Sequence, residues 1–420
     1  MTNPNQFHNT SSIVSLKQLR NLNFFWLGVT IYSIIHPFAA TNHPNIKILQ
    51  AVQVLGLILM FTTAISLIQL KFDNSYLKFI YILYCIWLFT IILRGYDFLL
   101  DYSYLKFLGS WYGMLYFTPL MLLFPRNFVF YKKVFDIVII FGIFYIIYDI
   151  LFIKDLLNSD RSSLTSQRIV ENFSNLSFSS GFILLTYVYH SKKRQLLAIG
   201  VTVLALLFAI IWARRGLILM YGNMILLSYI LYVFHSKTKL LIIYLTVFIA
   251  LLGAVYVSGV YKPYNNRIYG FLVDRGDENT RSGVELFFYD DMKTKDWIIG
   301  RGIKGEYFCP DIEENQITNY RSVIETGYLQ TILKGGLISL GLFLLMAIPA
   351  ILKGLFYSTN RLSKAAGIWI FMCLINSYPG TTNAFTLQYL LVWISIGICY
   401  SKAIRNIPEN EMKLYFLSKE

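Results

Sequence analysis

The sequence predicts an all-α polytopic membrane protein with about 12 transmembrane helices and one long outer loop that contains short helices. Hydrophobic residues make up 56% of the 420-residue chain and charged residues only 14%, whereas a soluble domain has about 25% charged residues. The mean hydropathy is +0.54. The apolar residues also fall in blocks of roughly 17–25, the length of helix that crosses a hydrocarbon core. This composition leaves too little polar surface for a globule in water.

The apolar blocks define twelve candidate spans. The first 22 residues are polar and do not resemble a signal peptide, so the first block is expected to stay as a membrane anchor. The candidate spans are residues 23–40, 48–70, 77–93, 105–124, 134–153, 175–190, 196–213, 216–234, 240–260, 326–352, 365–378 and 385–401.

Lys and Arg residues in the short connections predict the orientation. If the amino terminus is inside, every inner segment has at least two basic residues, whereas the last outer loop, residues 377–384, has none. This pattern places both termini in the cytoplasm and assigns the net charge of +14 to the membrane surface, not to nucleic acid. The predicted organisation is a cytoplasmic tail (1–22), nine spans (23–260), a long outer loop (261–325), three spans (326–401) and a second cytoplasmic tail (402–420).

Two adjacent arginines, Arg214 and Arg215, oppose this charge bias. They lie in the short outer hairpin between the seventh and eighth spans, beside Gly216, which is expected to let the turn close. A charge at the membrane interface costs a few kcal/mol unless it has a partner, and the planar guanidinium suits phosphate oxygens. The pair therefore indicates either a lipid-diphosphate site or two snorkelling anchors.

The long outer loop contains 12 of the 23 acidic residues and 9 of the 37 basic ones, so it is expected to face water. Residues 279–292 predict a helix with Val284, Phe287 and Phe288 on one face. Arg281 would lie in its first turn, beside free backbone N–H groups, which is an arrangement suited to an anion. The loop's single cysteine, Cys309, predicts no disulfide, and no Cys/His spacing indicates zinc.

Two further segments of the loop contain candidate residues. In Gly300-Arg301-Gly302 the glycines permit a tight turn that brings Arg301 close to another group. The run from Tyr320 to Gly336 predicts an interfacial helix that breaks near the double glycine and continues as the tenth span. On that helix Arg321, Glu325 and Tyr328 would share one face. They form either a surface ion pair or a carboxylate at the mouth of a cavity, able to accept a proton from a sugar hydroxyl.

In this order, the parts resemble the O-antigen polymerase and O-antigen ligase superfamily of bacterial membrane glycosyltransferases. The resemblance covers roughly residues 196–352 by motif and the rest by span count. It rests on Arg214-Arg215-Gly216, Thr280-Arg281-Ser282-Gly283, Gly300-Arg301-Gly302 and the run from Glu325 to Ile338. Ligases of this superfamily typically have a His-Asn pair where this chain has Glu325-Thr326, and residues 261–325 contain no histidine. This departure favours a polymerase and puts the identity of the base in doubt.

The resemblance implies metal-independent and cofactor-free transfer of a sugar chain from undecaprenyl diphosphate to the next lipid-linked repeat unit. The expected location is the outer face of a bacterial plasma membrane, with membrane lipid and a chain-length regulator protein as partners. The product would be a surface polysaccharide such as the O-antigen of lipopolysaccharide, a capsule or an exopolysaccharide. The expected roles are catalytic for Glu325, Arg281 and Arg215, diphosphate-binding for Arg214, Arg215, Arg281 and Arg301, and substrate-binding for Tyr320, Arg321 and Tyr328.

Two alternatives have the same gross features. A ligase would transfer finished polymer from the carrier lipid to an acceptor. A polysaccharide or lipid-linked sugar flippase would also have about twelve spans, but transporters often show internal repeats and polar residues near the bilayer midplane. This sequence shows neither feature, because its unexplained charges cluster at one outer face.

Overall fold

The computed structural model describes residues 15–39, 46–95, 102–158, 163–234, 236, 239, 280–310, 319–380 and 384–417. Within these residues the chain is mostly helical, and one pair of short antiparallel strands is present. The elements in chain order are α2 (Leu16–Ala39), α3 (Ile46–Leu67), α4 (Ser75–Leu93), α5 (Tyr102–Leu108), α6 (Trp111–Met114), η1 (Leu115–Leu123), α7 (Phe128–Leu151), α8 (Ile153–Leu156), α9 (Leu164–Ser177), α10 (Ser180–Leu185), η2 (Tyr187–Tyr189), α11 (Lys192–Ile211), α12 (Arg215–Phe234), α15 (Thr280–Asp291), α16 (Thr294–Ile299), β1 (Tyr307–Phe308), β2 (Tyr320–Arg321), α17 (Gly327–Phe356), α18 (Arg361–Asn376), α19 (Leu387–Tyr400), α20 (Lys402–Arg405) and α21 (Glu409–Leu417).

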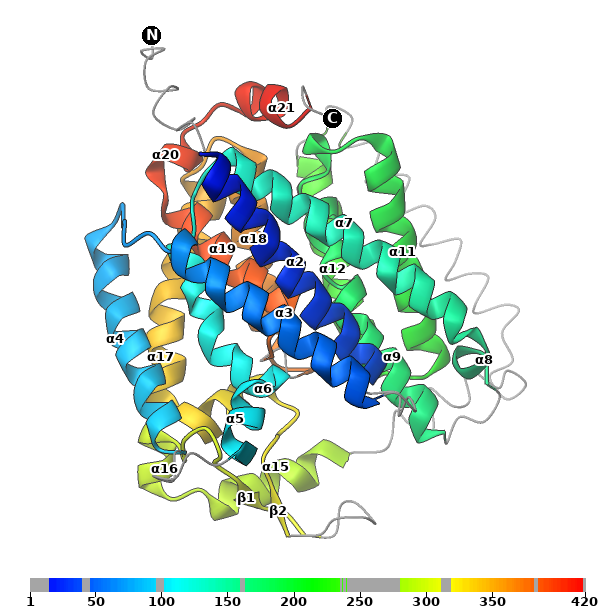
Figure 1. Cartoon of the computed structure of the whole chain (residues 1–420), viewed down its shortest axis with the longest axis vertical. Coiled ribbons are helices and arrows are strands. Elements are labelled where there is room, and N and C mark those ends of the chain that lie inside the picture. The colour runs from blue at the N-terminus through cyan, green and yellow to red at the C-terminus, as the bar shows by residue number, and fades with distance from the viewer. Residues whose placement is uncertain are drawn as a thin grey trace.

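The long helices lie side by side between two ends of the molecule (Figure 1). The start of α2 and the carboxyl-terminal helices α20 and α21 lie at one end, which we call the terminal end. Helices α15 and α16 and the strands β1 and β2 lie at the opposite end, which we call the loop end (Figure 1). The described part of the long loop is thus separated from both ends of the described chain by the length of the helices (Figure 1).

Six helices in the described residues are long and apolar enough to cross a membrane. They are the helices at Lys47–Leu67, Ser75–Leu93, Phe128–Leu151, Lys192–Ile211, Arg215–Phe234 and Gly327–Phe356. Their outer faces are apolar: Ile48, Ile65 and Phe79, for example, are 62–76% exposed. Large apolar side chains exposed along entire helices require an apolar solvent, so the protein is membrane-embedded.

Helices α2 and α3 pack with their backbones in close contact. A Cβ atom placed on Gly28 would lie 2.7 Å from the carbonyl oxygen of Gly56, and one on Gly56 would lie 3.0 Å from that of Gly28. Small residues at helix crossings permit this approach in membranes, where packing supplies much of the association energy. The two glycines therefore set the distance between α2 and α3.

Two predicted spans are not single helices, and a third cannot be compared. Residues 105–124 form α5, α6 and η1, because Ser110 caps α6 by accepting from the Gly113 N–H and Pro119 in η1 lacks a backbone donor. Residues 175–190 divide between α9, α10 and η2, where serine and threonine hydroxyls donate to nearby backbone carbonyls. The predicted span at 240–260 lies outside the described residues, and each of the other nine corresponds to one helix.

The described part of the long loop has its own small hydrophobic core. The predicted helix at 279–292 is confirmed as α15, and its predicted inner face is also confirmed. Phe288 is fully buried, Val284 is 9% exposed, and Phe287 packs against the same cluster. The remaining members are Met292, Tyr307, Cys309, Ile324, Leu329, Ile332 and Leu333. The core thus joins α15 and β1 to the first two turns of α17.

The predicted helix from Tyr320 to Gly336 is correct in its second half and wrong in its first. Tyr320 and Arg321 form β2, which pairs with Phe308 and Tyr307, and α17 begins only at Gly327. Arg321 therefore does not share a helical face with Glu325 and Tyr328. The predicted break is present at Gly336, which has φ 68° and ψ −176° inside α17. This conformation is essentially restricted to glycine.

Candidate functional site

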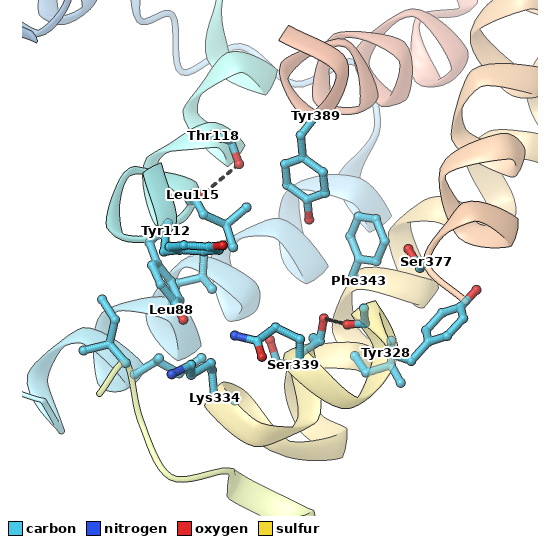
Figure 2. A pocket seen from close by; sticks show the side chains of 18 of the residues that line it. Leu88, Tyr112, Leu115, Thr118, Tyr328, Lys334, Ser339, Phe343, Ser377 and Tyr389 are labelled. Atoms are coloured by element: carbon cyan, nitrogen blue, oxygen red, sulfur yellow. Dashed lines mark hydrogen bonds between the residues drawn. The ribbon is translucent and has the colours of Figure 1, made fainter. Parts of the chain in front are cut away.

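A cavity at the loop end is enclosed mainly by α4, α17, α18, α19 and the segment from α5 to η1. Its volume is about 140 Å³, roughly ten times the ~10–15 Å³ that one buried water needs. Tyr389 points into it from α19, across from Ser339 and Lys334 on α17 (Figure 2). Tyrosine rings, hydroxyls and an amide form much of its wall: Tyr84, Tyr112, Tyr116, Thr118, Ser322, Tyr328, Gln330, Thr331, Ser339, Ser377 and Tyr389. This wall combines aromatic faces with hydrogen-bonding groups.

Lys334 is the lysine in the cavity wall. It is 9% exposed, and its ammonium donates a hydrogen bond of 2.7 Å to the carbonyl oxygen of Gly305. The lysine lies about two turns after the start of α17 and just before the break at Gly336. Its charge is thus held at the loop end of a helix that is otherwise apolar.

The Gly300-Arg301-Gly302 turn docks against the break in α17. Gly300 and Gly302 both have positive φ, 69° and 84°. The N–H groups of Arg301 and Gly302 donate to the carbonyls of Leu333 and Lys334 at 2.7 and 2.9 Å. The prediction that the glycines form a tight turn is confirmed, and the turn closes one side of the cavity, where Ile303 joins the wall.

Arg301 itself is paired inside the loop. Its guanidinium donates to the Asp296 carboxylate at 2.9 and 3.0 Å, to the Glu306 carbonyl at 2.7 Å, and to the Asp291 carboxylate. Burial lowers the pKa of Arg301, but the hydrogen bonds to Asp291 and Asp296 outweigh it and the net shift is upward. These bonds fix α15 and α16 to the turn, so Arg301 has a structural position in the loop.

The Arg214-Arg215 turn joins α11 to α12 at the loop end. The turn closes at Ala213, whose φ is 47°, whereas Gly216 lies within helix α12. The expected role of Gly216 in closing the turn is therefore wrong. Arg214 donates to the Gln167 side chain at 2.7 Å and pairs with Glu171 at 3.0 Å, both on α9. Arg215 is exposed at the first position of α12.

Helix α12 connects the arginine turn to the cavity, because it begins at Arg215. On α12, Asn223 donates to Asn376 at 3.0 Å. Asn376 ends α18, and the next residue, Ser377, belongs to the cavity wall. The turn and the cavity are thus connected through α12 and the end of α18.

Arg281 occupies the first turn of α15, as predicted, and its side chain lies outside the described residues. Four positions later, Glu285 accepts a hydrogen bond from the hydroxyl of Thr326, the residue that precedes α17. The first turn of α15 therefore lies near the start of α17.

The remaining predicted residues surround the start of α17. Glu325 is exposed, and it lies in sequence between Val323 and Gly327, which both belong to the cavity wall. Tyr328 lines the cavity and donates its hydroxyl to the Leu374 carbonyl. Tyr320 is 52% exposed and packs edge-on against Phe308, away from the cavity wall, and Arg321 beside it is half-buried in β2.

Sequence analysis assigned no role to Lys334 or to the cavity tyrosines of other helices. For Lys334 a signal was present, since a single lysine in an apolar run indicates a functional residue by default. No comparable signal distinguished Tyr389 or Tyr112 among the chain's 31 tyrosines.

Comparison with family models, with curated proteins and with solved structures found no match. Within the described ranges, no three His, Cys, Asp or Glu side chains form a group that could hold a metal ion.

Proposed function

We propose that this protein polymerises lipid-linked oligosaccharide repeat units at the outer face of a bacterial plasma membrane. In this proposal the chain has about twelve spans, both termini are cytoplasmic, and the loop end faces outward. The substrates are repeat units on undecaprenyl diphosphate, and a chain-length regulator is a protein partner. The proposal rests on the resemblance of the motifs to membrane polysaccharide polymerases and on the geometry of the loop end.

The observation that supports it best is that helix α12 connects the arginine turn to the cavity. Arg215 begins α12, and Asn223 on the same helix donates to Asn376, the residue before Ser377 of the cavity wall, so a phosphate at the turn and a sugar in the cavity would lie on connected elements. A diphosphate headgroup lies at the membrane interface, and its sugar projects into water. The loop end offers a place for both parts of this substrate. Guanidiniums can bind the phosphate oxygens, and an aromatic, hydroxyl-lined cavity can hold the sugar.

In the proposed reaction, an acceptor hydroxyl oxygen forms a bond to the anomeric carbon of the donor chain. The bond between that carbon and the diphosphate oxygen breaks, and the acceptor proton passes to Glu325. Arg214, Arg215 and Arg281 neutralise the charge that grows on the leaving diphosphate. Glu171 is 49% exposed, so phosphate oxygens can replace its carboxylate at Arg214 without opening the core.

The test of the diphosphate role is Arg214→Ala, with Arg194→Ala as its matched control. The two arginines lie beside opposite ends of α11, and each has an ion pair at 2.8–3.0 Å. We expect Arg214→Ala to abolish long-chain polysaccharide on a gel while leaving protein level and single-repeat material intact, and Arg194→Ala to leave chain length unchanged. Arg281→Ala is expected to match Arg214→Ala. Unchanged chain length in both Arg214→Ala and Arg281→Ala would contradict the diphosphate site.

The test of the proposed base is Glu325→Gln, with Glu306→Gln as a second exposed carboxylate in the same loop. Glutamine keeps the shape of the side chain but cannot accept the proton. We expect loss of polymer in Glu325→Gln alone, and full activity in that variant would exclude Glu325 as the base. Deletion of the whole chain separates the alternatives: a lost polymerase leaves one repeat on its acceptor, whereas a lost ligase leaves polymer on the carrier lipid.

A further inference from the structure

Lys334 is a buried cation without a counter-ion in the described residues. Burying an ammonium costs several kcal/mol unless it is paired. No carboxylate lies within 4.0 Å of Lys334 in the described part of the chain. The Lys334 ammonium has three N–H donors, and one of them bonds the carbonyl of Gly305. Two donors therefore remain for a group that enters the cavity.

The surrounding charges do not neutralise Lys334. Glu306 is exposed and acts on Lys334 through space only. Arg94, at the end of α4, donates to the carbonyls of Ile299 and Gly300 and brings no negative charge to the cavity. A neutral ligand would therefore leave the Lys334 ammonium without a carboxylate at contact distance in the described part of the chain.

We propose that the cavity binds a sugar that bears a carboxylate, and that Lys334 is the residue that pairs with this carboxylate. The inference rests on the proposed function, because it names the class of sugar that this site would take. The volume of about 140 Å³ suits one ring and its substituents. Ser339 and Tyr389 can bond the ring hydroxyls, while a compact ammonium provides a point charge for the carboxylate.

The experiment compares the binding of three probes: sodium glucuronate, glucose and inorganic phosphate. Glucuronate and glucose differ only at C6, which is a carboxylate in the first and a hydroxymethyl group in the second. Each probe is added at matched millimolar concentration and ionic strength to the purified protein in detergent, and its dissociation constant is measured from the rise in the thermal unfolding midpoint. We expect glucuronate to bind at least ten-fold more tightly than glucose, about 1.4 kcal/mol, and more tightly than phosphate. Lys334→Met removes the preference, whereas Lys353→Met, at the far end of the same helix, keeps it.

Three results would overturn the proposal: equal binding of glucuronate and glucose by the wild type, a preference for glucuronate that survives in Lys334→Met, or phosphate binding as tight as glucuronate binding. Lys334→Gln replaces Lys334→Met if the latter does not fold, and the wild-type comparison can refute the idea without either variant. A glucuronate preference that depends on Lys334, together with unchanged polysaccharide in cells from which the whole chain is deleted, would reject the polymerase and keep the acidic-sugar site.

Discussion

Substitution of Gly336 by alanine should undock the Gly300–Gly302 turn from α17. The position has φ 68° and ψ −176°, a backbone conformation that costs an alanine about 1–3 kcal/mol. The added Cβ would lie 2.1 Å from the carbonyl oxygen of Ile298 and 2.5 Å from the N of Ile299. These contacts are with backbone atoms, so the neighbouring segment has to move as a unit.

The expected loss of stability follows from this movement. Displacing the segment breaks the hydrogen bonds from the Arg301 and Gly302 N–H groups to α17, each worth about 0.5–1.5 kcal/mol. Adding the backbone strain gives a loss of about 2–6 kcal/mol, a large share of the ~5–15 kcal/mol by which proteins are stable.

The assay is the thermal unfolding midpoint of the purified protein in detergent, together with the rate of proteolysis within residues 294–310. Gly341→Ala is the matched control, because it lies in the same helix and a Cβ there meets no described atom within 4 Å. Alanine at Gly341 is expected to be neutral or to stabilise the helix by up to ~1 kcal/mol. If Gly336→Ala unfolds at the same temperature as Gly341→Ala and is cut no faster, the docking argument is wrong.

Two further substitutions test the loop end. Phe288→Ala empties the centre of the loop's own core, where Phe288 is fully buried against Trp297 and Tyr307. It should cost about 3–5 kcal/mol, measured as a lower unfolding midpoint than in Leu286→Ala, whose side chain is 60% exposed; equal midpoints would contradict the second core. Arg301→Lys keeps the charge, but lysine cannot bond both aspartates with a planar fork, so the thermal unfolding midpoint should fall. An unchanged midpoint would argue against a structural role for Arg301.

The helices that could be predicted from sequence are those with clear ends. Helix α7 is a long apolar run that starts after Asn127, whose side chain caps it by accepting from the Phe130 N–H. The divided segment from α5 to η1 could not be predicted, because Ser110 and Pro119 lie inside an apolar run. Proline is tolerated within membrane helices when neighbours satisfy the freed backbone groups, so its presence alone does not indicate a break.

The site was predictable only as separate motifs. The Gly300–Gly302 turn and the break at Gly336 were both expected, but the sequence did not indicate that one fits into the other. The partners of Arg301 depend on the spacing between α15 and α16, which places Asp291 and Asp296 around one guanidinium. Lys334 lies in the run from Glu325 to Ile338 on which the resemblance rests. Its position in a cavity wall, however, depends on tyrosines that helices far away in the chain contribute.

The break in α17 has a consequence for how the protein is assembled in the membrane. The carbonyls of Leu333 and Lys334 accept from the Gly300–Gly302 turn, and that of Gly335 accepts from Trp87 on α4. Without these donors, three carbonyls would be unpaired at the break, at about 1–3 kcal/mol each. The loop and α4 both precede α17 in the chain, so both donors are synthesised before the helix that needs them. Complete backbone pairing of α17 therefore requires the folded loop and α4 together with the helix itself.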